Sequence, residues 1–310
     1  MAGFLGSLGL GLLGAFLAER ANPSFETAEE LERFTSLPVL SSVPGIPDSR
    51  RRAGLKPSAN QTPLGGPLPS LGEPLTAGQR GHFEQHRLAA LSDPQSVAAQ
   101  QYSILALKVQ QWMVQTGGKT LLVTSASGEE GKSLTALNLS LALAASSEGR
   151  VLLVDADLRM PQVHTRLGLE SNRGFSDLLA PEGGDIGSYV SKIGALHVLA
   201  GGTNPANPVG LLASGRTREI FARLRNEYQL IVVDSPPIVP IADSHILAGL
   251  CDGVVLVVRA RRTQPELLLR AIESLGASNV IGVVLNDVEL AATPYANAYR
   301  YYQRHYLGRS

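Results

Sequence analysis

The sequence has only one cysteine, Cys251, in 310 residues, which excludes a disulfide within the chain. So little cysteine fits a reducing compartment, and no Cys/His cluster has the spacing of a zinc site. The chain also has no net charge, because its 27 basic residues (Lys and Arg) equal its 27 acidic residues (Asp and Glu). The overall charge therefore predicts no nucleic-acid partner. The remaining composition, 44% hydrophobic and 17% charged, suits one large α/β domain or two small ones.

Charge is absent altogether from residues 1–18, MAGFLGSLGLGLLGAFLA, which can just span a bilayer. Small residues at every fourth position would let one helix face pack closely on another helix. The lack of a basic start and of a clear cleavage site disfavours a signal peptide. A buried helix is the alternative, although so much glycine weakens a helix in water. We predict a transmembrane helix, with the following Arg20, Arg33 and 50–52 placing the remainder on the cytoplasmic side of the inner (cytoplasmic) membrane.

The next two segments differ from each other in composition. In the juxtamembrane segment 19–43, Thr27 and Glu30 form a capping-box pattern, which predicts a short helix that ends before Pro38. Residues 44–93 are rich in Pro and Gly and have few large apolar residues, so they cannot bury a core. We predict a disordered linker there.

From residue 94 onward, strand-like and helix-like runs alternate. The strand-like runs are nearly all apolar, as expected for strands buried on both faces of a sheet. They cover 119–125, 150–157, 196–202, 228–235, 252–260 and 279–287, and helical patterns cover 96–113, 132–146, 217–227, 242–250 and 264–276. Residues 94–290 therefore predict an α/β domain with a doubly wound, mostly parallel sheet.

The segment ASGEEGKS, residues 126–133, follows a predicted strand and precedes an apolar helix. It fits the P-loop pattern G-x-x-x-x-G-K-[ST] except at the first position, where Ala126 replaces Gly. Backbone N–H groups at a helix start point at phosphate oxygens, while Lys132 reaches the terminal phosphates and Ser133 can ligate Mg²⁺. This predicts a P-loop NTPase. The predicted nucleotide contacts are Gly128, Glu129, Glu130, Gly131, Lys132, Ser133 and Leu134.

Carboxylates follow two of the predicted strands. Asp155 and Asp157 end VLLVDAD, and Asp234 ends LIVVD. Ligands of open α/β sheets bind at the carboxyl ends of the strands, where buried acids are costly unless a cation is near. We expect Mg²⁺ as that cation, with Ser133, Asp155, Asp157 and Asp234 as candidate ligands.

Several motifs agree in order and spacing with one family. DADLRMPQVH, NRGFSDLLA, NPANPVGLLAS, LIVVDSPPIVPIADSHILAGLCDGVVLVVRA and the tyrosine-rich end resemble the bacterial tyrosine autokinases of polysaccharide export. The resemblance covers residues 95–290 and the tail. The N-terminal part is similar to the end of the polysaccharide co-polymerase (chain-length determinant) module, whose earlier membrane helix and periplasmic domain are not in this sequence.

The resemblance implies an ATP- and Mg²⁺-dependent protein-tyrosine autokinase that regulates exopolysaccharide or capsule synthesis and export. It implies catalytic roles for Lys132, Asp155 and Asp157, with Asp155 as the base that accepts the tyrosine proton. Asp157 and Asp234 would arrange the metal, and Asn286 matches the position that meets the adenine. The implied partners are other copies of the chain, the polysaccharide polymerisation and export machinery, a cognate phosphotyrosine phosphatase and the membrane.

The tail, residues 291–310, carries five of the eight tyrosines of the chain. They are Tyr295, Tyr299, Tyr301, Tyr302 and Tyr306. Without Phe or Trp partners they do not fit an aromatic stripe on a core or a patch on a membrane surface. We predict that they are phosphoacceptors, modified by a neighbouring copy, and each phosphate would add a charge of about −1.5 to −2.

One feature of the family is missing from the helix before the P-loop. The family usually has a Glu-x-x-Arg-x-x-Arg pattern there, which serves ring assembly. The aligned residues here are Gln100, Ser103 and Ala106, so ring formation through this contact lacks its charged groups. For Arg159, two interpretations stay open: steering phosphates, or binding a carboxylate of a neighbouring molecule.

Two other functions fit part of the sequence. A MinD/ParA-like ATPase would act as a nucleotide switch and transfer phosphate only to water. It does not account for the tyrosine tail, and such ATPases usually have a second lysine early in the P-loop, which ASGEEGK lacks. A scaffold that binds ATP without turnover is disfavoured by the intact Lys132, Asp155, Asp157 and Asp234.

Overall fold

The computed structural model describes residues 24–46, 73–147, 149–169, 173–276 and 280–289. The predicted transmembrane helix, most of the predicted linker and the tyrosine tail lie outside these residues. In the part of the chain that is described, no helix is both long enough and apolar enough to cross a membrane.

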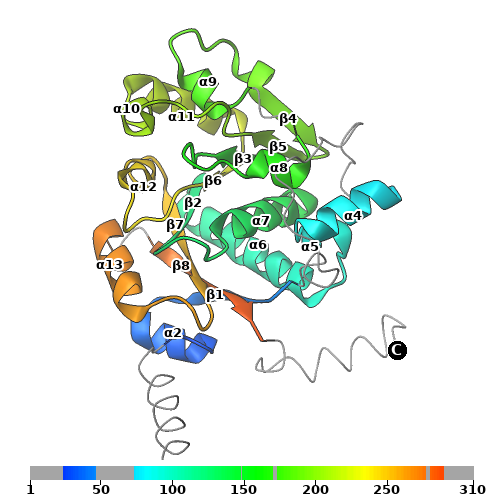
Figure 1. Ribbon diagram of the computed structural model, residues 1–310, viewed down its shortest axis with the longest axis vertical. Coiled ribbons are helices and arrows are strands. Elements are labelled where there is room, and N and C mark those ends of the chain that lie inside the picture. Colours follow the sequence, from blue (N-terminus) through cyan, green and yellow to red (C-terminus); the bar gives the residue numbers. More distant parts are fainter. Residues whose placement is uncertain (1–23, 47–72, 148, 170–172, 277–279, 290–310) are drawn as a thin grey trace, which may run out of the picture.

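A single sheet of eight strands, in the order β1-β8-β7-β2-β6-β3-β5-β4, forms the centre of the molecule (Figure 1). Every pairing is parallel except that of β4 with β5. The predicted α/β fold with a mostly parallel sheet is therefore confirmed. The strands are β1 (Val39–Pro44), β2 (Thr120–Ser125), β3 (Val151–Asp155), β4 (Val190–Ile193), β5 (Leu196–Leu199), β6 (Leu230–Asp234), β7 (Gly253–Arg259) and β8 (Val280–Val288).

Helices cover both faces of this sheet. Because neighbouring residues of a strand point to opposite faces, each central strand contributes to two separate cores. Leu122 and Val233 pack in one core with α2, α9, α10, α11, α12 and α13, and Leu121 and Val232 pack in the other with α4 to α8. The helices are α2 (Ala28–Thr35), α4 (Ala77–Gln85), α5 (Ala89–Ser92), α6 (Val97–Thr116), α7 (Lys132–Ser146), α8 (Val163–Leu167), α9 (Phe175–Leu179), the 3₁₀ helix η1 (Ile186–Tyr189), α10 (Pro208–Leu212), α11 (Gly215–Glu227), α12 (Ala242–Ala248) and α13 (Pro265–Leu275).

The N-terminal part of the described chain begins with the predicted short helix. The Thr27 side chain caps α2 by accepting a hydrogen bond from the Glu30 N–H at 3.3 Å, and Ser36 ends the helix in the left-handed conformation. Leu31, on the inner face, is fully buried against the sheet. The structure therefore confirms the predicted start at Thr27 and the expected end before Pro38.

The segment after α2 belongs to the same sheet as the P-loop. Strand β1 pairs in parallel with β8, so that Val43 lies beside Asn286, and the Lys108 side chain of α6 donates to the Val39 carbonyl at 3.2 Å. This differs from the expected organisation, in which the folded domain begins at residue 94. The apolar residues of β1 find their partner strand near the other end of the chain, and no local pattern reports such a pairing.

Two short helices, α4 and α5, occupy part of the segment expected to be a linker. Phe83 of α4 and Leu88, just before α5, are fully buried in the core that includes α6 and α7. The Asn138 amide of α7 donates to the Arg87 carbonyl at 3.2 Å, which fixes the turn between the two helices. The end of the expected linker is therefore folded onto the domain.

We expect Leu31→Ala to lower the free energy of unfolding by about 2–5 kcal/mol, because it removes a fully buried side chain between α2 and the sheet. Urea denaturation measures this change. The control is Leu107→Ala on α6, where the side chain is 61% exposed and a change within about 0.5 kcal/mol is expected. An unchanged midpoint for Leu31→Ala would mean that α2 lies outside the cooperative unit.

Candidate active site

The P-loop runs from the end of β2 to the start of α7. Gly131 stands at the N-cap of α7 with a φ of 96°, and this helix start has no side-chain cap. Glu129 is also left-handed, with a φ of 62°. A Cβ at Gly131 would collide with the Asn286 side chain, so this position requires glycine for two reasons. The first N–H groups of α7 are thus left for an anion.

Glu130 lies in the loop but turns its side chain inward. Its carboxylate accepts hydrogen bonds from the Ala126 N–H at 3.0 Å, the Ser127 hydroxyl at 2.8 Å and the Thr263 hydroxyl at 2.9 Å. The side chain is nearly inaccessible, and this burial raises the pKa of the Glu130 carboxyl. Among the predicted nucleotide contacts, Glu130 can therefore contribute only through its backbone, while its side chain maintains the shape of the loop.

A second set of contacts holds the loop from the side of β7 and β8. Arg259, at the end of β7, pairs with Asp287 at 2.7 Å and also donates to the Glu129 carbonyl at 3.0 Å. Next to Asp287, the Asn286 amide donates to the Glu130 carbonyl at 2.9 Å. The residue expected to meet the adenine is thus bonded directly to the phosphate-binding loop.

The carboxylates of β3 and β6 face each other at the carboxyl edge of the sheet. The register pairs Asp155 with Asp234, and both side chains are fully buried. One Asp155 oxygen accepts from the backbone N–H groups of Gln162 and Val163, each at 3.0 Å. The start of α8 therefore holds the Asp155 side chain in a single orientation.

Lys132 connects the P-loop with this acidic edge. Its ammonium lies 2.9 Å from Asp157 Oδ2 and 3.3 Å from the Ser133 hydroxyl. Burial lowers the pKa of Lys132, but the carboxylates of Asp234 and Asp157 outweigh it and raise the pKa overall. The lysine is thus a permanent cation at the place where the sequence predicted terminal phosphates.

The acidic pair carries more negative charge than its surroundings balance. Burial, and then the neighbouring Asp234, raise the pKa of Asp155 to about 8. Burial also raises the pKa of Asp234, although Lys132 lowers it. Ionising both of two neighbouring buried carboxylates costs free energy, because the two charges repel each other and neither is solvated. A further cation at this edge would restore the ionised state of both.

The groups present fit a magnesium ion. Asp155 Oδ1 and both carboxylate oxygens of Asp234 are buried and have no hydrogen-bond partner, and Mg²⁺ prefers such oxygen ligands. Within the described residues, however, no three His, Cys, Asp or Glu side chains are placed to hold a metal by themselves. The predicted set of Ser133 and three aspartates is therefore no closed metal centre. Phosphate oxygens and water would have to complete the coordination.

Arg159 has a carboxylate partner within its own chain, and the two roles left open for it stay predictions. Its guanidinium forms a two-pronged ion pair with Asp243 of α12 in the same chain, with N···O distances of 2.9 and 3.0 Å. Asp243 is fully buried, whereas the Arg159 side chain is partly exposed. The pair ties the segment after Asp157 to the helix that follows β6.

The structure brings together most of the predicted site and leaves one part aside. Residues 128–134, the three aspartates and Asn286 gather at the carboxyl edge of the sheet. The tyrosines of the tail lie outside the described residues. Sequence reasoning missed Arg259, Thr263, Asp243 and Asp287. The only available signal was that Arg259 and Asp287 follow apolar strands, as Asp155 does.

Comparison with known proteins gives one matching family model. Residues 121–308 match the CobQ/CobB/MinD/ParA nucleotide binding domain. The chain is 34% identical over 215 residues to tyrosine-protein kinase YwqD of Bacillus subtilis (strain 168), covering 68% of this chain and 90% of YwqD. It is 30% identical over 311 residues to the putative tyrosine-protein kinase EpsB of Ralstonia solanacearum, covering 99% of this chain but only 38% of EpsB.

Solved structures share the fold. The kinase domain of Escherichia coli tyrosine kinase ETK superposes with a TM-score of 0.70 at 23% identity, covering 87% of this chain and 97% of that one. The kinase domain of VpsO is 32% identical with a TM-score of 0.55, covering 60% of this chain and 93% of that one.

We expect Asp155→Asn to change how stability depends on pH in magnesium-free buffer. In the folded chain the pKa of Asp155 is about 8, above the ordinary value, so the folded state binds a proton at Asp155 more tightly than the unfolded state does. In the parent, this proton binding adds to the free energy of unfolding. The added stability is full below about pH 4 and is lost as the pH rises to about 8. Thermal unfolding across this range should show that the variant gains stability relative to the parent.

The control for this measurement is Glu273→Gln, at an exposed position of α13. It removes a carboxylate far from the acidic edge and should leave the parent's pH dependence in place. Parallel curves for Asp155→Asn and the parent would contradict the raised pKa of Asp155.

Proposed function

The chain belongs to the bacterial tyrosine-protein kinases, and from this premise we propose that it transfers the γ-phosphoryl group of ATP to tyrosines of its own C-terminal segment. One observation carries the proposal. The Lys132 ammonium lies 2.9 Å from Asp157, at the same edge as the in-register pair Asp155 and Asp234. A phosphate-binding cation and candidate proton acceptors are thus within one small volume beside an uncapped helix start.

The proposed reaction is an in-line displacement at phosphorus. A tyrosine oxygen attacks the γ-phosphorus, the bond from the γ-phosphorus to the β,γ-bridging oxygen breaks, and ADP leaves with that oxygen. The phenolic proton passes to Asp155, and Lys132 together with the loop N–H groups stabilises the negative charge on the phosphates. A bound Mg²⁺ would supply further charge neutralisation between the phosphates.

The geometry of Asp155 suits the role of proton acceptor. Its orientation is set by the two N–H groups at the start of α8, so the free oxygen Oδ1 has a defined direction. Its pKa is raised to about 8 in the absence of a cation, so a cation bound beside it would be needed to keep the carboxylate ionised and able to accept the proton near neutral pH.

The proposed acceptors are Tyr295, Tyr299, Tyr301, Tyr302 and Tyr306. The tyrosine tail also separates this proposal from the alternative of a MinD/ParA-like switch, which would transfer phosphate to water and would have no use for the tail. We propose further that transfer takes place between copies of the chain, because a tail of this length can reach a neighbouring site.

The wider setting is proposed from the resemblance in the sequence. We propose that residues 1–18 anchor the chain in the inner membrane with the kinase domain in the cytoplasm. We propose that the protein acts with the machinery of exopolysaccharide polymerisation and export, and that a phosphotyrosine phosphatase reverses its modification. The chain spans 38% of the length of EpsB.

Assembly through the helix before the P-loop has little support on α6. Gln100 uses its side chain to bond the Pro94 carbonyl, Ser103 bonds back to the Ala99 carbonyl, and Ala106 is buried. None of the three offers a charge to a neighbouring copy. We therefore propose that copies meet transiently, through the tail, and not in a ring held by this helix.

We expect Lys132→Met to reduce autophosphorylation at least about 100-fold, because the charge on the terminal phosphates loses its cation. The fold should persist, since apolar residues anchor α7 along its buried length. Mass-spectrometric mapping of phosphate after incubation with ATP and Mg²⁺ measures the effect, and circular dichroism checks folding. Lys192→Met, at an exposed lysine of β4, is the control. Undiminished labelling of the Lys132 variant would exclude the assigned site.

We expect the tail to be labelled by a second copy. The test mixes a Lys132→Met chain with an active chain whose five tail tyrosines are phenylalanine. Phosphate should appear on the inactive chain, because only that chain has acceptors and only the other has a working site. No label in the mixture, with labelling of the parent that does not depend on dilution, would show that each chain modifies itself.

A further inference from the structure

Two short helices at the end of the expected linker, α4 and α5, lie beside α7 and α8 (Figure 1). We refer to residues 77–92 as the α4–α5 hairpin. Its Phe83 and Leu88 are fully buried in the same core as Val163 and Leu167 of α8. The hairpin is therefore part of the packing around the helix that orients Asp155.

A hydrogen bond joins the hairpin to the end of α8. The His82 Nε2 atom lies 3.1 Å from the carbonyl oxygen of Arg166, which is in the last turn of α8. A carbonyl oxygen can only accept, so Nε2 carries the hydrogen in this contact. The last carbonyl groups of a helix have no donor within that helix, and the His82 ring supplies one from outside.

The shortness of α8 carries this contact to the active site. The helix has five residues, Val163–Leu167, and at 1.5 Å per residue it is roughly 7.5 Å long. A helix this short has little stability of its own, so its position depends on what it contacts. Arg166 donates its N–H to the Gln162 carbonyl at 3.1 Å, and the N–H groups of Gln162 and Val163 hold Asp155. A shift of Arg166 therefore moves the two donors of Asp155.

The other end of the hairpin is fixed to the phosphate-binding helix. Asn138, fully buried in α7, donates to the Arg87 carbonyl at 3.2 Å and accepts from the Ala90 N–H at 3.3 Å. Since α7 begins at Lys132, the hairpin contacts both the helix that carries the phosphate-binding lysine and the helix that orients Asp155. It is thus placed to set the position of one relative to the other.

We propose that His82 is a positioning residue for phosphoryl transfer: through the Arg166 carbonyl it holds α8, and through α8 it holds Asp155 in place relative to Lys132. This inference rests on the proposed kinase function and adds to it a residue from the segment that was expected to be a linker. The effect on rate is large for a small movement, because a misplacement of about 1 Å at a reacting group can cost as much as about 100-fold.

Two replacements of His82 separate its N–H group from its ring. The ring packs edge-on against Phe83, with centroids 5.6 Å apart, and lies 4.5 Å from the ring of His86. His82→Phe keeps an aromatic ring for these contacts but has no N–H group. His82→Gln loses the ring but keeps an amide N–H at a similar distance along the side chain. If the hydrogen bond is what matters, the glutamine variant behaves like the parent and the phenylalanine variant does not.

The first measurement is the initial rate of tail labelling by the full chain in detergent, with Mg²⁺ and varied ATP. His82→Phe should lower kcat about tenfold and change KM for ATP less than about twofold, because the contacts of the P-loop with phosphate remain. His82→Gln should leave both values within about twofold of the parent.

The second measurement needs no activity. Hydrogen exchange followed by mass spectrometry, without nucleotide, reports the protection of peptides that contain residues 162–167. In His82→Phe these amides should exchange about tenfold faster than in the parent, because α8 opens more often. In His82→Gln they should exchange at the parent rate.

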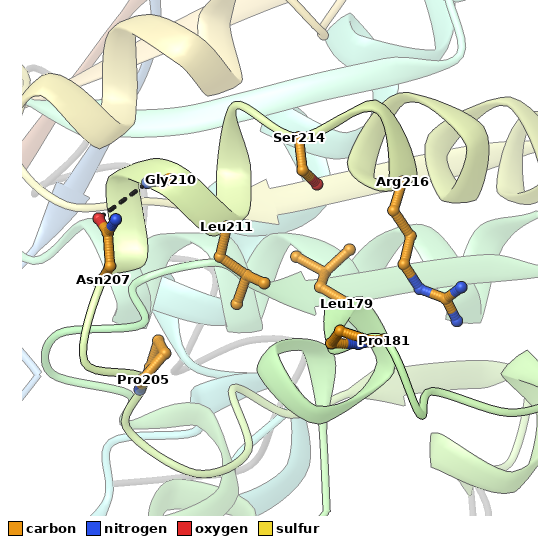
Figure 2. Close-up of a pocket in the computed structure, with 8 residues that line it drawn as sticks. All are labelled: Leu179, Pro181, Pro205, Asn207, Gly210, Leu211, Ser214 and Arg216. Atoms are coloured by element: carbon orange, nitrogen blue, oxygen red, sulfur yellow. Dashed lines mark hydrogen bonds between the residues drawn. The ribbon is translucent and has the colours of Figure 1, made fainter.

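The opposite face of the sheet provides the control. Figure 2 shows a hollow of about 480 Å³ between α9 and α10, with Leu179, Pro181 and Leu211 among its lining residues. Leu211 packs against the other core, away from the α4–α5 hairpin. Leu211→Ala therefore removes apolar packing without touching α8, and it should leave both kcat and the exchange of residues 162–167 unchanged.

The outcomes separate this inference from the proposed function. Unchanged exchange of residues 162–167 in His82→Phe would show that α8 does not depend on His82, whatever the activity. Faster exchange with an unchanged kcat would overturn the positioning role while the kinase function stands. Equal losses in His82→Gln and His82→Phe would assign the effect to ring packing, and an equal loss in Leu211→Ala would assign it to general stability. If the parent labels nothing, the proposed function itself falls, and the positioning role falls with it.

Discussion

The chemistry of this molecule depends on the parallel pairing of β3 with β6. That register sets Asp155 beside Asp234, and β6 in turn pairs with β2, from which the P-loop departs. A slip of one residue in either strand would turn its carboxylate to the other face of the sheet. The apolar side chains that pack on both faces of these strands therefore also determine where the carboxylates lie, and no separate device is needed to align them.

Because Asp155 and Asp234 are buried, the groups around them determine whether they are ionised. Lys132 supplies one cation, and the two N–H groups of α8 satisfy one oxygen of Asp155, yet three carboxylate oxygens remain without partners. Such a site is costly until a cation or phosphate-bound metal arrives. The same imbalance keeps the pKa of Asp155 high, so the protonation of this carboxyl depends on which cation binds beside it.

The P-loop is held from two directions by residues other than those expected to bind phosphate. Inside, the Glu130 carboxylate bonds Ala126, Ser127 and Thr263, and outside, Arg259 bonds the Glu129 carbonyl. These contacts leave the N–H groups at the start of α7 free for phosphate. The strand β1 extends this arrangement to the N-terminal side, since Val43 pairs with Asn286 at the far edge of β8. The segment 24–46 and the nucleotide loop thus form one folded unit.

Local sequence was sufficient for the P-loop, the strand-end carboxylates, the alternation of strands and helices, and the cap at Thr27. Each depends on residues close in the chain, where spacing and side-chain type report backbone geometry. Local sequence was insufficient for β1, which is a strand only because β8 offers an open edge. It was also insufficient for the side-chain partners of Arg159 and Arg259. It also could not show that Glu130 turns inward. Those choices were made by tertiary packing, because charged groups and edge strands take the partner that the completed fold brings within reach.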